Sequence, residues 1–267
     1  MDQTDWLSFF DFLTTGTFVL SWYVSGFILT LWVIYDVLYI NTSVSKPLKV
    51  GWPIIVFFFS IIGLLLYLLT CRAPGIANLE EDKKKKVHHK YVTPVFNKVT
   101  GSVIHCVAGD GLGIMTAMVI GRYIGLSFWS EFTGEYISGF FFGWILFQYP
   151  AMRSMGNSSA QSLWKGGRAD FFSMITLMTG MLLTMKLVQP HIVTSAPLPG
   201  TYAFWGIASF ALFIGTIVTY PMNWLLVSIG WKHGMPWALL FEVHRGGFND
   251  SSHVVVAINV SMLKVKT

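Results

Sequence analysis

The chain has little charge and almost no cysteine. Charged residues make up 12% of its 267 residues, and its two cysteines are Cys71 and Cys106. So small a charged fraction excludes an ordinary soluble domain of this size. Two cysteines are too few for a disulfide framework and show no secreted-type spacing, so we interpret both as free thiols.

Further absences narrow the class of function. No basic residue precedes the first long apolar run, so a signal peptide is not indicated and we expect the first span to be retained. The sequence has no phosphate-binding Gly-Lys-Ser/Thr loop, no His-Glu-x-x-His and no Gly-x-Ser-x-Gly. We therefore expect a protein that is not an enzyme. The net charge of +5 does not indicate nucleic acid, because the basic residues lie between apolar runs.

The sequence is rich in long runs of hydrophobic residues. Hydrophobic residues make up 54% of the chain, and the mean hydropathy is +0.58. Long apolar runs predict an all-α integral membrane helical bundle of about six transmembrane helices. The expected spans are 18–40, 51–70, 102–126, 134–151, 169–188 and 202–229.

The runs divide the chain into four parts. These are an N-terminal two-span hairpin (1–70), a cytoplasmic basic and histidine-containing linker (71–101), a four-span core (102–235) and a C-terminal tail (236–267). With six spans, most Lys and Arg residues fall on the side that holds both termini. The excess of positive charge predicts that both termini are cytoplasmic, and we expect the protein in the inner (cytoplasmic) membrane of the cell. The His88–His89 pair in the linker fits a solvated loop, or alternatively metal capture or pH sensing.

The third span carries the main candidate site. His105, Cys106 and Asp110 are ionisable groups in a segment expected to lie in lipid, where such groups usually face the bundle interior. Cys106 and Asp110 are four residues apart and share a helix face. A thiolate, an imidazole and a carboxylate suit copper or zinc. The alternative is a hydrogen-bonded histidine beside a cysteine that packs as a small apolar residue. Nearby glycines predict close approach of a neighbouring helix.

Two further spans contribute to the same predicted interior. In the fifth span, Asp170, Met174, Met178, Met181 and Met185 form one stripe at helical spacing. Such a stripe is typical of core packing, but thioethers also select Cu(I), so the stripe could relay that ion. In the sixth span, Asn223 follows a proline and predicts either a stabilised kink or a hinge.

The order of several motifs resembles a prokaryotic multi-pass membrane family known as domain of unknown function 4396. The matching positions are Asp36, Trp52, Pro53, His105, Cys106, Gly109, Phe147, Gln148, Tyr149, Ala169, Asp170, Ser173, Gly180, Met181, Tyr220, Pro221, Asn223, Trp224, Gly230, Lys232 and Met235. The resemblance implies a helical membrane domain without an assigned activity. The family tends to have a second cysteine where this chain has Asp110, and an acidic residue where it has Ile114. A paired-thiol site is therefore not implied here.

From these residues we predict transition-metal handling or transport across the membrane, of the copper type. The candidate ligands of a copper or zinc ion are His105, Cys106, Asp110, Asp170, Met174, Met178 and Met181. The alternative is a non-catalytic accessory subunit of a larger membrane complex. The expected partners are the lipid bilayer and, in addition, other membrane subunits or further copies of the chain. No nucleic-acid partner is expected.

Overall fold

A computed structural model describes residues 7–232, and every regular element in this part of the chain is a helix. The all-α prediction is therefore confirmed. The elements are η1 (Leu7–Thr14), α1 (Gly16–Tyr35), η2 (Asp36–Ile40), α2 (Lys46–Thr70), η3 (Ile76–Asn78), α3 (Glu81–Val92), α4 (Val95–Tyr123), α5 (Phe128–Phe142), η4 (Gly143–Gln148), α6 (Tyr149–Ser154), α7 (Ser159–Leu187), α8 (Gln189–Ile192) and α9 (Tyr202–Ser228).

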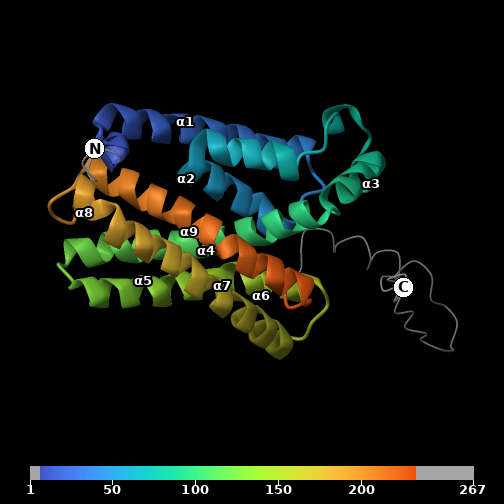
Figure 1. Cartoon of the computed structure of the whole chain (residues 1–267). Coiled ribbons are helices and arrows are strands. Elements are labelled where there is room, and N and C mark those ends of the chain that lie inside the picture. Colours follow the sequence, from blue (N-terminus) through green and yellow to red (C-terminus); the bar gives the residue numbers. More distant parts are fainter. Residues whose placement is uncertain (1–6, 233–267) are drawn as a thin grey trace, which may run out of the picture.

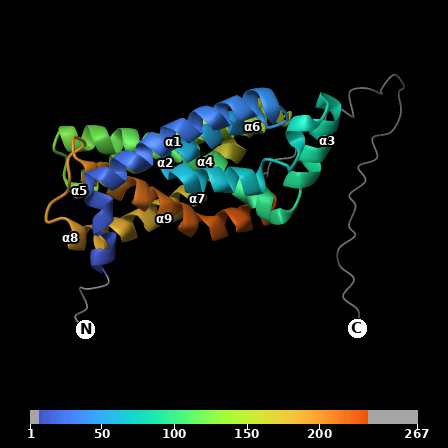
Figure 2. The same ribbon diagram turned by 90° about the horizontal axis from the view of Figure 1, so that it is seen from above.

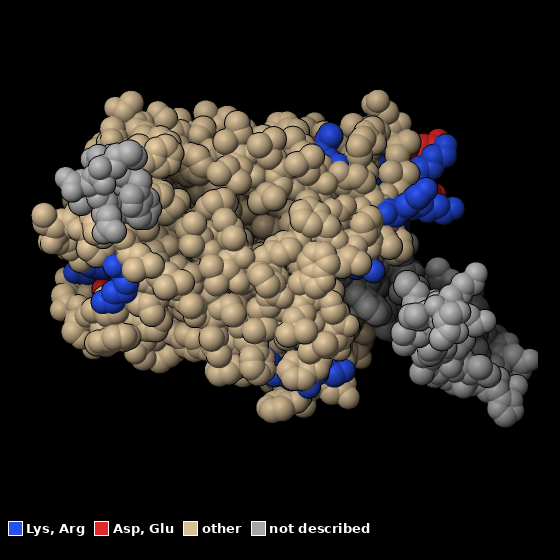
Figure 3. Space-filling model, in the orientation of Figure 1, with Lys and Arg blue, Asp and Glu red and all other residues tan. Residues whose placement is uncertain are grey.

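The long helices lie side by side in an elongated bundle, with α3 packed at one end (Figures 1 and 2). Five segments are long and apolar enough to cross a membrane: Gly16–Ile40, Lys46–Thr70, Val95–Tyr123, Ser159–Ile192 and Tyr202–Ser228. On the face shown in Figure 3, charged side chains lie near the ends and the middle is uncharged. These features support an integral membrane protein that contacts the lipid bilayer.

The fourth expected span, 134–151, falls within α5, η4 and α6. These three elements follow one another without a break, and η4 is a π-helical segment. Glycines of α4 allow α5 and η4 to approach closely, as the sequence indicated. A Cβ at Gly109 would lie 2.7 Å from the Cα of Gly143, and a Cβ at Gly113 would collide with the carbonyl of Ser138.

The second expected span is helical but does not run straight through the bundle. Ser60 has φ 46° and ψ −124°, so α2 consists of two arms that fold back on each other. The rings of Trp52 and Tyr67 are only 5.3 Å apart, and a Cβ at Gly63 would lie 2.8 Å from the Cα of Val56. We call residues 46–70 the re-entrant hairpin. The expectation of a second full crossing was wrong, because a serine with positive φ reverses the chain.

Side chains of α1 satisfy backbone groups of the re-entrant hairpin. The indole N–H of Trp22 donates to the Phe58 carbonyl at 2.9 Å, and the Thr30 hydroxyl donates to the Pro53 carbonyl at 3.1 Å. The hydroxyl groups of Ser25 and Ser60 are hydrogen-bonded at 2.7 Å. Non-helical backbone at membrane depth is tolerated where protein buries it, and α1 provides that cover.

The two ends of the bundle differ in charge. We call the end that holds α3, both ends of α2, the α6–α7 turn and the end of α9 the basic end (Figure 1). All described Lys and Arg residues lie near it except Arg122 and Lys186, which lie near the opposite end. The expectation of termini on one side depended on six crossings. In the described residues, the start of α1 and the end of α9 lie at opposite ends (Figure 1). The predicted C-terminal tail lies outside the described residues.

The predicted linker is more ordered than a loop. It contains α3, and α4 already begins at Val95, seven residues before the expected start of the span. Lys84 and His88 of α3 are buried. Residues 71–101 therefore contain a helix that packs part of its surface on the basic end and are more than a solvated connection.

Candidate functional site

A group of buried polar side chains lies inside the bundle, between α4, η4, α7 and α9. We call it the interior polar cluster and define it as Cys106, Asp110, Gln148, Asp170, Ser173, Asn223 and Lys232. Each of these residues is at most 4% exposed. The structure thus brings together Cys106 and Asp110 of the predicted third span with Asp170 of the predicted fifth span.

Lys232 enters the cluster from beyond the end of α9. Gly230 adopts a left-handed conformation with φ 72°, and the Trp231 N–H donates to the Leu226 carbonyl at 2.9 Å. With the Gly230 N–H on the Val227 carbonyl at 3.2 Å, this is a Schellman motif. The motif turns the chain back over the helix end. The guanidinium of Arg168 lies 4.3 Å from the Trp231 ring centre and packs the turn against α7.

Three side chains surround the ammonium group of Lys232. Its Nζ donates to Cys106 Sγ at 2.6 Å, to Ser173 Oγ at 2.6 Å and to Asn223 Oδ1 at 2.8 Å. All three donors of the ammonium are therefore used. Lysine is almost never fully buried unless it is paired, so the cluster provides the polar surroundings that keep this charge inside the protein.

Two carboxyl groups of the cluster are incompletely hydrogen-bonded. A Cβ at Gly143 would collide with Asp110 Oδ1 and would lie 2.8 Å from Asp170 Oδ2, so these two oxygens are neighbours. Gln148 Nε2 donates to Asp170 Oδ1 at 3.4 Å. Among the described residues, neither oxygen of Asp110 nor Oδ2 of Asp170 has a hydrogen-bond partner. Two adjacent buried carboxylates cannot both stay charged without a nearby cation or a shared proton.

The remaining predicted ligands lie outside the cluster. His105 packs its ring edge-on against Phe147, with 5.5 Å between ring centres, and its Nε2 has no partner among the described residues. Met174, Met178 and Met181 are buried in the hydrophobic core, along α7 from Asp170 toward the end opposite the basic end. In the described part of the chain, no three His, Cys, Asp or Glu residues form a group that could hold a metal ion.

Sequence reasoning missed Lys232 as a site residue. It placed Lys232 in a cytoplasmic segment after the last span, because nothing in a hydropathy profile shows that a lysine turns back into the bundle. The Gly-x-Lys spacing after the helix is a usable signal, since a glycine at this position favours a left-handed helix end. Gln148 and Ser173 were noted only as parts of motifs, and Asn223 was expected at a kink.

The fold defines an all-α membrane bundle with a polar interior. The model of the family "Domain of unknown function (DUF4396)" matches residues 95–232, which is more than half of the chain, and the chain belongs to this family. The model described as "Phospholipase_D-nuclease N-terminal" matches residues 28–70, from within α1 to the end of the re-entrant hairpin. No curated protein and no solved structure matches the chain.

Proposed function

We propose that the protein binds a monovalent thiophilic cation, of the Cu(I) type, at the interior polar cluster and moves it within the membrane. One observation carries the proposal: the Lys232 ammonium is held by a thiol, a hydroxyl and an amide oxygen beside two carboxyl groups with unpartnered oxygens. The lysine thus occupies a cation position in an otherwise acidic and soft-ligand environment.

The charge balance favours one additional positive charge. Asp110 and Asp170 together bring two negative charges when ionised, and Lys232 neutralises one of them. A proton or a monovalent metal ion would neutralise the other. Thiol and thioether ligands select Cu(I) over hard ions, and Cys106 and Met174 supply these two groups in the cluster and next to it. A closed zinc site needs four ligands, which fits the described residues less well.

The buried methionines of α7 define the proposed path of the ion through the bundle. Met174, Met178 and Met181 continue from Asp170 along one face of α7. In this proposal the cluster receives the ion from the basic end, and the methionine thioethers relay it toward the opposite end. Core packing alone also explains why these methionines are buried. The relay is therefore tested by measuring Cu(I) binding.

We also propose that the basic end faces the cytoplasm of a cell that carries this protein in its inner membrane. Lys and Arg concentrate in cytoplasmic loops of membrane proteins, and here all but two of the described ones lie near the basic end. This orientation places the start of α1 on the opposite side.

Competition with a chromophoric Cu(I) chelator under reducing conditions tests the proposal on the purified full chain. We expect one Cu(I) per chain in the wild type and at least ten-fold weaker binding in Cys106→Ser. Lys232→Met removes the competing cation and should bind at least as tightly as the wild type. Cys71→Ser is the matched control, because Cys71 is also a buried free thiol but belongs to the base of the re-entrant hairpin.

Equal binding by the wild type and Cys106→Ser would refute a copper function. The alternative function, an accessory subunit of a larger membrane complex, predicts a preparation from native membranes that contains further chains and no bound ion. Measuring the bound copper and the co-purifying chains in a preparation from native membranes therefore distinguishes the two proposed functions.

A further inference from the structure

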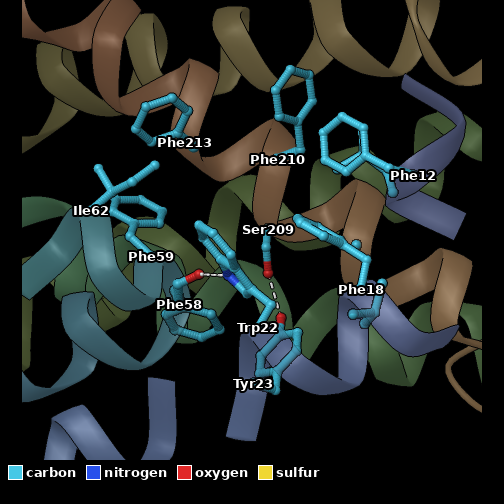
Figure 4. A pocket seen from close by; sticks show the side chains of 13 residues that line it. Phe12, Phe18, Trp22, Tyr23, Phe58, Phe59, Ile62, Ser209, Phe210 and Phe213 are labelled. Carbon is cyan, nitrogen blue, oxygen red and sulfur yellow. Dashed lines mark hydrogen bonds between the residues drawn. The ribbon is translucent and has the colours of Figure 1, made fainter. Parts of the chain in front are cut away.

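The re-entrant hairpin leaves space between α1 and α9 beyond its tip. Ser60 at the tip is hydrogen-bonded to Ser25, which lies midway along α1. From there to the end opposite the basic end, no hairpin arm separates α1 from α9. A cavity of about 200 Å³ occupies this space, lined by η1, the first half of α1, the hairpin tip and the first half of α9 (Figure 4).

The wall of this cavity offers no free polar group. Its polar side chains bond within the wall: Tyr23 with Ser209, and the Trp22 indole with the Phe58 carbonyl (Figure 4). Aromatic rings of Phe12, Phe18, Phe59, Phe210 and Phe213 form most of the remaining surface. Water in a buried site needs polar partners, and an apolar cavity of about 150 Å³ already binds benzene. The wall therefore favours an apolar occupant.

A second hollow lies beside this cavity and is open to the outer surface of the bundle. It has a volume of about 430 Å³, lies between α1 and the hairpin tip, and shares Phe18 and Trp22 with the first cavity. Its other lining residues include Ile28 and Ile61, which are 59% and 57% exposed. These two side chains lie on α1 and α2, which are among the five segments long and apolar enough to cross a membrane, so we infer that the hollow opens toward lipid.

We propose that the two cavities together form a binding site for one acyl chain of a membrane phospholipid. The chain enters from the bilayer between α1 and the hairpin tip and ends among the aromatic rings beside α9. Its hydrocarbon makes contacts that need no hydrogen bond, in agreement with the paired polar side chains of the first cavity. The site lies apart from the interior polar cluster, so the proposal is independent of any cation function.

Photo-crosslinking tests this site. The full chain is reconstituted in bilayers of phosphatidylcholine that carries a diazirine near the end of one acyl chain, irradiated, digested and analysed by peptide mass spectrometry. We expect labels on the cavity-facing residues of α1, the hairpin tip and α9 in addition to the general labelling of lipid-facing residues.

Cavity-filling variants separate the site from general lipid contact. Val19→Phe and Ile62→Phe fill the cavity from two different helices, and each should reduce labelling of the α9 wall at least five-fold. The matched controls are Leu20→Phe and Leu65→Phe, since both residues are more than 50% exposed on the same helices and face away from the cavity. They should leave this labelling unchanged. Absent labelling of the α9 wall in the wild type, equal labelling in fillers and controls, or crosslinks to a second protein chain would each overturn the proposal.

Discussion

Replacing Ser60 tests whether α2 turns back inside the membrane. At φ 46° and ψ −124°, a residue with a Cβ is strained by roughly 1 to 3 kcal/mol. The Ser60–Ser25 hydrogen bond contributes roughly 0.5 to 1.5 kcal/mol in return. Ser60→Ala loses the hydrogen bond and keeps the strain, whereas Ser60→Gly loses the hydrogen bond and relieves the strain. After the entropic cost of glycine, roughly 0.5 to 1 kcal/mol, we expect Ser60→Gly to be more stable than Ser60→Ala by about 1 kcal/mol.

A straight helix predicts the opposite sign. In a helix interior, glycine is less stable than alanine by roughly 1 kcal/mol. The free energy of unfolding is measured by titrating the protein from mild micelles into a denaturing detergent, with helix content followed by circular dichroism. Ser25→Ala is the control, because it removes the same hydrogen bond and leaves the backbone at Ser60 unchanged. If Ser60→Ala is more stable than Ser60→Gly, the chain does not reverse at this residue and the re-entrant hairpin is refuted.

Three further predictions concern the rest of the fold. Cysteines introduced at Lys46 and Lys83 should react with a membrane-impermeant maleimide from the same side, whereas a fully crossing α2 would separate them. Burial lowers the pKa of His88 to about 4, so its neutral form stabilises the packing of α3. This stabilisation, on the order of 3 kcal/mol, is complete above about pH 6.5 and is lost as pH falls toward 4. Amide exchange of α3, corrected for intrinsic rates, should rise over this range in the wild type and stay flat in His88→Gln. Gly113→Ala should lower the free energy of unfolding by several kcal/mol, because the new Cβ collides with the α5 backbone. Gly134→Ala, where the Cβ meets nothing within 4 Å, should not.

Hydropathy and helical spacing predicted most of the fold because they report which faces of a helix are apolar. All six expected spans are helical, the glycine face of α4 contacts α5, and Cys106, Asp110 and Asp170 lie together in the interior. The family resemblance is also confirmed by the match over residues 95–232.

The features that sequence reasoning missed depend on single backbone conformations. The reversal occurs in a run where Ser60 is the one polar residue between Ile54 and Ile62 and no proline lies at the turn, and positive φ at serine is uncommon. The position of Lys232 depends on the left-handed conformation of Gly230 and on the three acceptors that the ammonium finds inside the bundle. Hydropathy averages over many residues, so it cannot detect a reversal made by one.

The two proposals belong to different parts of the chain. The interior polar cluster lies wholly within residues 95–232, the part that matches the family, so any cation function should extend to relatives that have the same residues at these positions. The acyl-chain site instead lies where α1 and the re-entrant hairpin meet α9, and it needs residues that the other family model matches. A relative that has only the family core should therefore keep the cluster and lack the cavity. Comparing Cu(I) binding and lipid crosslinking in such a relative would separate the two functions without any mutation, because Cu(I) binding should persist there and labelling of the α9 wall should be lost.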